Sequence, residues 1–254
     1  MKVITVANQK GGVAKTTTAT SLAAILTSWG KKALMIDADE QCNTTDTYRA
    51  KVEGVASLYD LILDEDPCSI EDAIQHTEFG DIIAGDPGLA TAESVLSKDR
   101  DYSRLDTALK SLKGYEYVII DTHPSVNSIL YTTLAASDSV IIPLYADRYS
   151  LSGISMLLDT IYEVKNKLNA RLRIDGILMC RIDNRRVLDK DFQKEIEALK
   201  EEIGVNVFRT RIRETIKCRE SQVKRTPLIF YAPDCTAEED YENLVTELTG
   251  IRRK

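Results

Sequence analysis

Residues 2–18 read KVITVANQKGGVAKTTT, and this stretch decides the fold. Its first half is apolar and β-branched, which predicts a strand, and a helix is expected from Thr16 to about Trp29. Gly11 and Gly12 lie in the short loop between them. A helix that opens directly after such a loop points free backbone N–H groups at an anion. The stretch therefore predicts a phosphate-binding loop at the start of an α/β fold.

The loop departs from the general phosphate-binding pattern G-x-x-x-x-G-K-[ST]. Lys15 and Thr16 match the lysine that reaches the β- and γ-phosphates and the hydroxyl that binds Mg²⁺. Gln9 and Ala14 occupy the two glycine positions, so backbone freedom has to come from the neighbouring glycine pair. An ordinary glycine turn is the alternative. We predict that ATP contacts eight consecutive residues, namely Lys10, Gly11, Gly12, Val13, Ala14, Lys15, Thr16 and Thr17.

Carboxylates follow two further predicted strands. The segment DADEQ at 37–41 ends one strand, and YVIID at 117–121 ends another. Open α/β sheets bind ligands at the carboxyl ends of their strands. Asp37 and Asp39 can hold Mg²⁺ through water and orient an attacking water, and Asp121 can support the metal. A loop cap is the alternative role for each of them.

Strand and helix patterns alternate along the rest of the chain. Apolar runs at 81–85, 139–146 and 173–180 predict strands, and helical patterns lie at 103–112, 150–168, 189–203 and 237–248. The strand runs are almost continuously apolar, as in strands that are covered on both faces. This order predicts a doubly wound, mostly parallel sheet flanked by helices. No linker or repeat interrupts it, so residues 1–254 are expected to form a single domain.

Composition excludes several classes of protein. The 254 residues carry a formal net charge of -7, which argues against a uniformly basic surface. No leader peptide and no stretch of about 20 apolar residues is present, so a cytoplasmic protein without a membrane span is expected. The five cysteines form no C-x-x-C pair and are read as reduced thiols.

Taken together, these motifs resemble those of the deviant Walker ATPases, which carry an extra lysine early in the loop, here Lys10. Among them the chain looks most like the ParA/Soj partition ATPases. The resemblance covers nearly the whole length, because eight segments fall in the family's order: ANQKGGVAKTTT, DADEQCN, YVIIDTHPS, ASDSVIIPL, YSLSGISMLLDTI, GILMCRIDNRR, VFRTRI and AEEDYENLVTEL. The chain departs from the family pattern at five positions, which are Ala14, Glu40, His123, Arg213 and Glu214.

The resemblance implies a role for each site residue. Lys15 would bind the β- and γ-phosphates, and Thr16 would bind Mg²⁺. Lys10 would reach the nucleotide of a partner subunit across a homodimer interface. Asp39 would orient or activate water, and the metal would be supported by two further carboxylates, Asp37 and Asp121. ATP and Mg²⁺ are the implied cofactors.

A basic stretch near the C-terminus suggests DNA as a binding partner. Seven cations lie between residues 209 and 225, and the family pattern places DNA contacts at Arg185 and Lys217, to which we add Arg219. Cations of this kind suit the DNA backbone, although a solvated helix face is the alternative. The expected protein is a nucleoid-associated partition ATPase whose ATP-bound dimer binds DNA nonspecifically and is released by a ParB-type partner. A MinD-like ATPase that positions a cargo other than DNA is the alternative, but a basic amphipathic terminal helix for membrane binding is not evident.

Overall fold

The computed structural model describes residues 1–63, 65–99, 101–145, 150–183, 194, 196, 200 and 204–253. Only the backbone is described for 97–99 and 150–153. The predicted helix at 189–203 and the DNA-binding candidate Arg185 therefore lie outside the described residues, apart from isolated positions of that helix.

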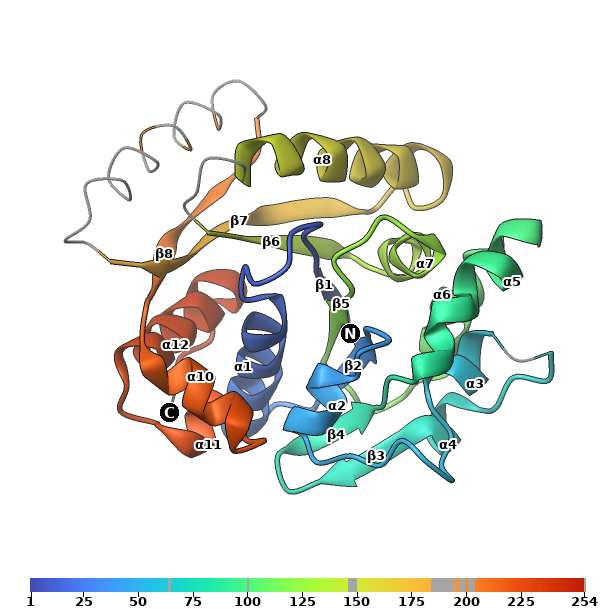
Figure 1. Cartoon of the computed structure of the whole chain (residues 1–254), viewed down its shortest axis with the longest axis horizontal. Coiled ribbons are helices and arrows are strands. Elements are labelled where there is room, and N and C mark those ends of the chain that lie inside the picture. Colours follow the sequence, from blue (N-terminus) through green and yellow to red (C-terminus); the bar gives the residue numbers. More distant parts are fainter. Residues whose placement is uncertain are drawn as a thin grey trace.

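One sheet of eight strands organises the described chain (Figure 1). Its order is β3-β4-β2-β5-β1-β6-β7-β8, and every neighbouring pair is parallel except β3 and β4. The strands are β1 Lys2–Val6, β2 Ala33–Ala38, β3 Ile74–Thr77, β4 Gly80–Ile83, β5 Tyr117–Thr122, β6 Ser139–Tyr145, β7 Arg173–Ile182 and β8 Val207–Arg213. The predicted doubly wound, mostly parallel α/β fold is confirmed.

Helices cover both faces of this sheet (Figure 1). They are α1 Lys15–Ser28, α2 Asn43–Thr47, α3 Leu58–Ile62, α4 Ile70–Ala73, α5 Ala92–Asp99, α6 Arg104–Ser111, α7 Ser128–Ala135, α8 Ser150–Lys167, α10 Ile216–Val223, α11 Leu228–Tyr231 and α12 Thr236–Thr249. A 3-10 helix, η1, spans Pro87–Thr91. In the part of the chain that the structure describes, no helix is long and apolar enough to cross a membrane.

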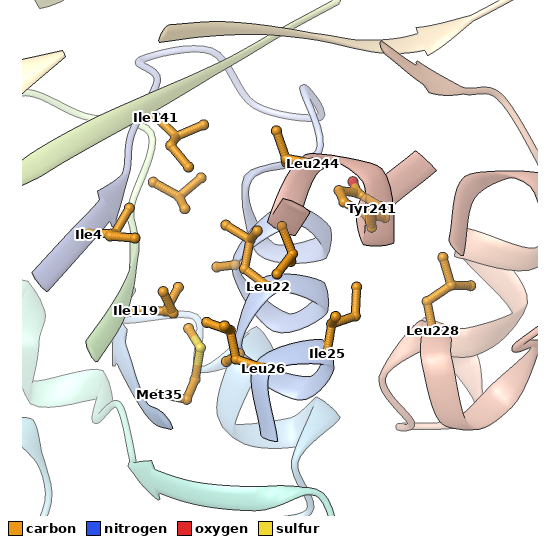
Figure 2. Packing of buried hydrophobic residues seen from close by; sticks show 14 of the residues in the cluster. Ile4, Leu22, Ile25, Leu26, Met35, Ile119, Ile141, Leu228, Tyr241 and Leu244 are labelled. Carbon is orange, nitrogen blue, oxygen red and sulfur yellow. The ribbon is translucent and has the colours of Figure 1, made fainter. Parts of the chain in front are cut away.

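Alternate side chains of each central strand pack into separate hydrophobic clusters on the two faces of the sheet. On β5, Ile119 packs toward α1 and α12, whereas Val118 and Ile120 belong to the cluster under α3 and α6. Leu22 of α1 and Tyr241 of α12 are fully buried on the first face (Figure 2). Alternate residues of a strand point to opposite faces, so a strand covered on both sides has to be apolar throughout. This packing holds α1, and with it the preceding loop, against the carboxyl end of the sheet.

Two edge strands and several of the described helices were not predicted from the sequence. In β3 the four residues IQHT are short and mostly polar, and β8 interleaves arginines with apolar residues because it lies at the other edge. The helices that were likewise missed are α2, α3, α4, α5, α7, α10 and α11. Edge strands tolerate polar side chains because one side of the strand remains open to solvent. The periodic apolar signal is therefore weakest at these edges.

Candidate nucleotide-binding site

The predicted phosphate loop connects β1 to α1 and is fixed at its base by Asn8. The Asn8 Nδ2 donates to the Pro143 carbonyl oxygen at 2.6 Å, and Asn8 Oδ1 accepts from the Lys10 backbone N–H at 3.0 Å. Asn8 is 4% exposed, so these bonds form away from water. The side chain therefore ties the start of the loop to the neighbouring strand β6. Sequence reasoning missed this residue because a single asparagine after a strand carries no specific signal.

Ala14 adopts the left-handed conformation that relatives would satisfy with glycine. Its φ is 72° and its ψ is 28°, at the N-cap of α1. Within the glycine pair, Gly12 has a φ of 75°, whereas Gly11 has no positive φ. Gly12 therefore supplies the backbone freedom expected of the glycine pair, but the left-handed backbone at position 14 remains. The left-handed conformation costs a residue with a Cβ roughly 1–2 kcal/mol.

Lys15 extends into the site from the first residue of α1. It is 7% exposed, and its Nζ donates to the Lys10 carbonyl oxygen at 3.0 Å. Burial lowers the pKa of Lys15, and the nearby carboxylates of Asp121 and Asp39 oppose that shift. An ammonium group that is poorly solvated and held by one loop carbonyl is well suited to exchange that partner for phosphate oxygens.

The three predicted carboxylates have different surroundings. Asp37 and Asp121 are adjacent across β2 and β5, and both are fully buried. Burial, together with the charge of Asp121, raises the pKa of Asp37 to about 7. Burial also raises the pKa of Asp121 to about 6, although hydrogen bonds from Thr16 and Thr44 oppose the shift. Asp39 is 5% exposed and its Oδ1 accepts from the Gln41 backbone N–H at 2.9 Å.

Asp37 performs the loop-cap role that the sequence left open. Its Oδ2 accepts two hydrogen bonds of 2.7 Å from the backbone N–H and the hydroxyl of Thr45, and its Oδ1 accepts from the Asp39 N–H at 3.2 Å. Gly85 lies close to this carboxylate, and a Cβ there would meet Asp37 Cγ at 3.1 Å. Neither Asp37 nor Asp121 lines the cavity described below. With both of its oxygens in hydrogen bonds, Asp37 has a metal role that stays a prediction.

Asp121 retains an acceptor that fits a hydrated cation. Thr44 Oγ1 donates to its Oδ2 at 2.8 Å, but its Oδ1 is buried without a hydrogen-bond partner. Among the described residues there is no cluster of three or more His, Cys, Asp or Glu side chains in metal-binding geometry. Mg²⁺ needs no such cluster, because it keeps several waters and is commonly held by one or two protein ligands together with phosphates. Thr16 and Asp121 therefore fit Mg²⁺.

A cavity of about 540 Å³ opens over the loop. Its volume lies within the range of ordinary ligand pockets. Six of the eight residues predicted to contact ATP line it, namely Gly11, Gly12, Ala14, Lys15, Thr16 and Thr17, whereas Lys10 and Val13 do not. The catalytic candidate Asp39 lines it as well. The far wall comes from β8, α10 and α12, with Ile212, Thr215, Cys218, Gln222 and Tyr241.

Four of the five positions that depart from the family pattern pair with other charged or polar groups. Glu40 and His123 approach each other at the mouth of the site, with Glu40 Oε1 3.9 Å from His123 Nε2. Arg213 forms a bidentate pair with Asp240, with contacts of 2.7–3.0 Å. Glu214 lies 3.0 Å from Arg181. The substitutions therefore add local electrostatic contacts around the cavity.

Arg181 is a second residue that the site analysis of the sequence missed. Its φ is 58°, and its guanidinium lies 4.5 Å from the centre of the Tyr145 ring and 3.5 Å from the Gly12 carbonyl oxygen. The side chain thus spans from β7 to the phosphate loop and to Glu214. Sequence reasoning did not assign this arginine to the site, because nothing in a linear pattern shows that β7 ends beside the loop.

The described DNA-binding candidates lie on α10. Lys217 Nζ is 2.8 Å from Glu220 Oε2, and Arg219 is exposed at the edge of the cavity. Two other cations of the basic stretch, Arg213 and Arg225, form ion pairs with Asp240 and Asp46. Local carboxylates therefore offset part of the positive charge that the sequence assigned to this surface.

Comparison with known proteins gives consistent matches. Residues 1–174 match the model of a family described as an AAA domain. The chain is 33% identical to the chromosome partitioning protein ParA of Caulobacter vibrioides, with 100% of this chain and 96% of that protein covered. It is 36% identical to the sporulation initiation inhibitor protein Soj of Bacillus subtilis, with 98% of each covered. A structure of a Cyanothece McdA variant in complex with ATP superimposes with a TM-score of 0.86, at 29% identity, covering 100% of this chain and 98% of that one.

Proposed function

Because this chain belongs to the ParA/Soj family of ATPases, we propose that it is a partition ATPase whose ATP-bound dimer binds DNA nonspecifically. The chain is an ATPase that uses ATP and Mg²⁺. The observation that carries the partition proposal is the cavity over the phosphate loop, whose far wall is the helix that bears Lys217 and Arg219. Arg219 lies at the edge of the cavity and Lys217 lies outside it, so one short helix carries both the nucleotide wall and the candidate DNA contacts.

Lys15 has the central electrostatic role in the proposed reaction. Its ammonium leaves the Lys10 carbonyl oxygen for the β- and γ-phosphate oxygens, where it compensates the negative charge of the transition state. Thr16 and Asp121 would hold Mg²⁺, which would neutralise phosphate charge when it is bound. The low exposure of Lys15 strengthens its attraction to phosphate, since water screens it poorly.

Asp39 is the group that orients the attacking water. It is nearly buried yet lines the cavity, and the Gln41 N–H fixes one of its oxygens. The other oxygen remains for a water molecule placed against the terminal phosphate. Such positioning accelerates hydrolysis without contributing to phosphate affinity. Lys10 contacts the nucleotide of the partner subunit in the proposed dimer, and its flexible side chain suits that reach.

The output of the cycle is the release and rebinding of DNA on the nucleoid, in the cytoplasm. One subunit offers few phosphate contacts, whereas a two-fold dimer doubles them on one face. ATP then controls DNA binding through dimerisation, and a ParB-type partner stimulates hydrolysis and releases the dimer. Local ion pairs at Lys217 and Arg225 weaken the basic surface, so the alternative of a positioning ATPase with a non-DNA cargo is decided by experiment.

The test is DNA binding of the full chain with ATP, with ADP and without nucleotide, using unrelated duplexes of equal length. Tight DNA binding should occur with ATP but not with ADP or without nucleotide, and all the duplexes should bind with equal affinity. Arg219→Gln should then reduce the salt slope by nearly 1.8, since each lost phosphate contact is worth about 0.9 and a dimer loses two. Lys113→Gln is the matched control, because this exposed lysine precedes β5, at the opposite end of the strands. Equal binding with ADP, or none with ATP, refutes the DNA proposal.

A further inference from the structure

Two helices that contribute to the cavity end in left-handed arginines. Arg49, with a φ of 54°, follows Tyr48, the C-cap of α2. Arg225, with a φ of 51°, follows Lys224, the C-cap of α10. Glycine is the usual residue at this position because it has no Cβ. A left-handed arginine persists only where surrounding contacts hold it, and here its side chain makes such contacts.

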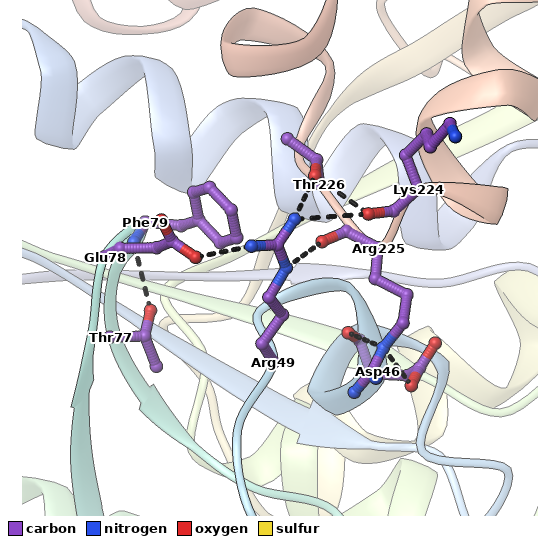
Figure 3. A network of polar contacts seen from close by, with 8 residues as sticks. All are labelled: Asp46, Arg49, Thr77, Glu78, Phe79, Lys224, Arg225 and Thr226. Carbon is purple, nitrogen blue, oxygen red and sulfur yellow. Dashed lines mark hydrogen bonds and ion pairs between the residues drawn. The ribbon is translucent and has the colours of Figure 1, made fainter.

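Each arginine caps the helix that the other one terminates (Figure 3). Arg49 donates from Nε to the Arg225 carbonyl oxygen at 3.0 Å and from Nη2 to the Lys224 carbonyl oxygen at 3.3 Å. Arg225 Nε donates to the Asp46 carbonyl oxygen at 3.3 Å and lies 2.7 Å from Asp46 Oδ1. Carbonyl groups at helix ends often lack partners within their own helix. Here the Asp46 carbonyl also accepts from the Arg49 N–H at 3.1 Å. The Lys224 carbonyl also accepts from the Thr226 hydroxyl at 3.0 Å, and the two guanidinium groups add reciprocal bonds between the helices. We call Arg49, Arg225 and Asp46 the arginine clasp.

One side of the clasp is attached to the buried carboxylates at the ends of β2 and β5. Thr44 of α2 donates to Asp121 at 2.8 Å, and Thr45 donates to Asp37 at 2.7 Å. Asp46 of the same helix lines the cavity. A change at these carboxylates on nucleotide binding therefore acts directly on α2.

The other side of the clasp is attached to the far wall of the cavity. Gln222 of α10 donates from Nε2 to Thr17 Oγ1 of α1 at 3.2 Å, and Arg219 lines the cavity. Lys217 and Arg219 of this helix are also the described candidates for DNA contact. Lys217 lies outside the cavity and Arg219 lies at its edge, and we call these two residues the basic side of α10.

We propose that the arginine clasp is a positioning device that makes α2 and α10 respond together to nucleotide, and so passes the nucleotide state from Asp37 and Asp121 to the basic side of α10. Arg225 and Asp46 are about half exposed, and such surface pairs add little stability. Their effect is therefore on the relative placement of the two helices. The DNA output rests on the proposed function, whereas the coupling between α2 and α10 does not.

The main test is Arg225→Gly in the full chain. This change removes the guanidinium and leaves a residue that suits the left-handed backbone better than arginine, so the fold should be retained. Arg49→Gly is the second variant and follows the same logic. Lys224→Gln is the matched control, since it removes a neighbouring charge but leaves the carbonyl that Arg49 contacts. Hydrogen exchange of α2 and α10 is measured without nucleotide, with ADP and with ATP, together with ATP affinity and denaturant stability.

We expect ATP to slow exchange in both helices of the wild type and of Lys224→Gln. In Arg225→Gly the slowing in α10 should fall by at least about 5-fold, the lower range of ordinary coupling between sites, while ATP affinity and α2 protection persist. Combining both glycine variants should add nothing further, because either one opens the same clasp. Wild-type protection of α10 in Arg225→Gly overturns the inference.

DNA binding provides the second readout. The ratio of DNA affinity with ATP to that with ADP should fall at least about 5-fold in Arg225→Gly, but not in Lys224→Gln, which should weaken both states equally. If the wild type binds DNA equally well with ATP and with ADP, the partition proposal fails. The hydrogen-exchange measurement then still tests whether the clasp couples α2 and α10. An unchanged ratio in Arg225→Gly contradicts transmission to the basic side of α10.

Discussion

Replacing Ala14 with glycine should stabilise the protein, against the usual direction of such a change. The left-handed backbone at this position costs alanine roughly 1–2 kcal/mol, which glycine does not incur. Glycine also makes the unfolded chain more flexible, which costs about 0.4–1 kcal/mol. The net gain in the free energy of unfolding is therefore about 0–1.5 kcal/mol. Because the strain lies in the phosphate loop, we also expect Ala14→Gly to raise the basal rate of ATP turnover.

Urea unfolding and steady-state ATP turnover measure the two effects. Ala170→Gly is the control, because this alanine is exposed and has no positive φ, so only the unfolded-state cost applies. The free energy of unfolding of Ala14→Gly should exceed that of Ala170→Gly by about 1–2 kcal/mol, which isolates the strain. Equal values for the two variants would show that the loop stores no strain. Unchanged turnover in Ala14→Gly would show that the strain does not limit the rate.

The remaining predictions concern charge at the site and in the core. Lys15→Ala should abolish ATP binding or hydrolysis, because the ammonium compensates charge at the phosphates, and wild-type turnover in a coupled assay would remove the basis of the site. Asp39→Ala should keep ATP affinity while lowering turnover, since orienting water is a later requirement than binding phosphate; a loss of affinity measured with a fluorescent ATP analogue would make Asp39 a structural ligand. Burial, reinforced by Glu242, raises the pKa of Glu238 from 4.5 to about 8, and neither carboxylate oxygen has a hydrogen-bond partner. The folded state therefore holds this proton more tightly than the unfolded state, so the contribution of Glu238 to stability falls as pH rises from about 4.5 to 8. The difference in free energy of unfolding between Glu238→Gln and the wild type should grow in favour of the variant when the pH is raised from 5 to 8.5. The growth should exceed about 1.4 kcal/mol, the equivalent of one pKa unit. A difference that does not depend on pH would contradict the assignment.

The sequence determined the central fold because its signals there are local and repeated. The first apolar run, the glycine pair and the helix of buried alanine and leucine residues predicted β1, the loop and α1 to within one or two residues. Strands that are covered on both faces are apolar at almost every position, and this continuous apolar pattern predicted β2, β5 and β6. Lys15, Thr16 and Asp39 line the cavity, and the sequence could bring them together because each follows the end of such a strand.

Only the tertiary structure decided which neighbours those residues have. Asp37 and Asp121 are far apart in sequence, yet adjacent parallel strands place them side by side in the core, where burial raises the pKa of both. Arg181 reaches the loop, and Arg49 caps the helix that ends at Arg225, because β7 and α10 pack beside segments more than 160 residues earlier. A linear pattern records the type and spacing of residues but not which surfaces meet. Contacts between distant segments follow from how sheet and helices bury their apolar faces together, and this packing fixed the walls of the cavity and the clasp that joins them.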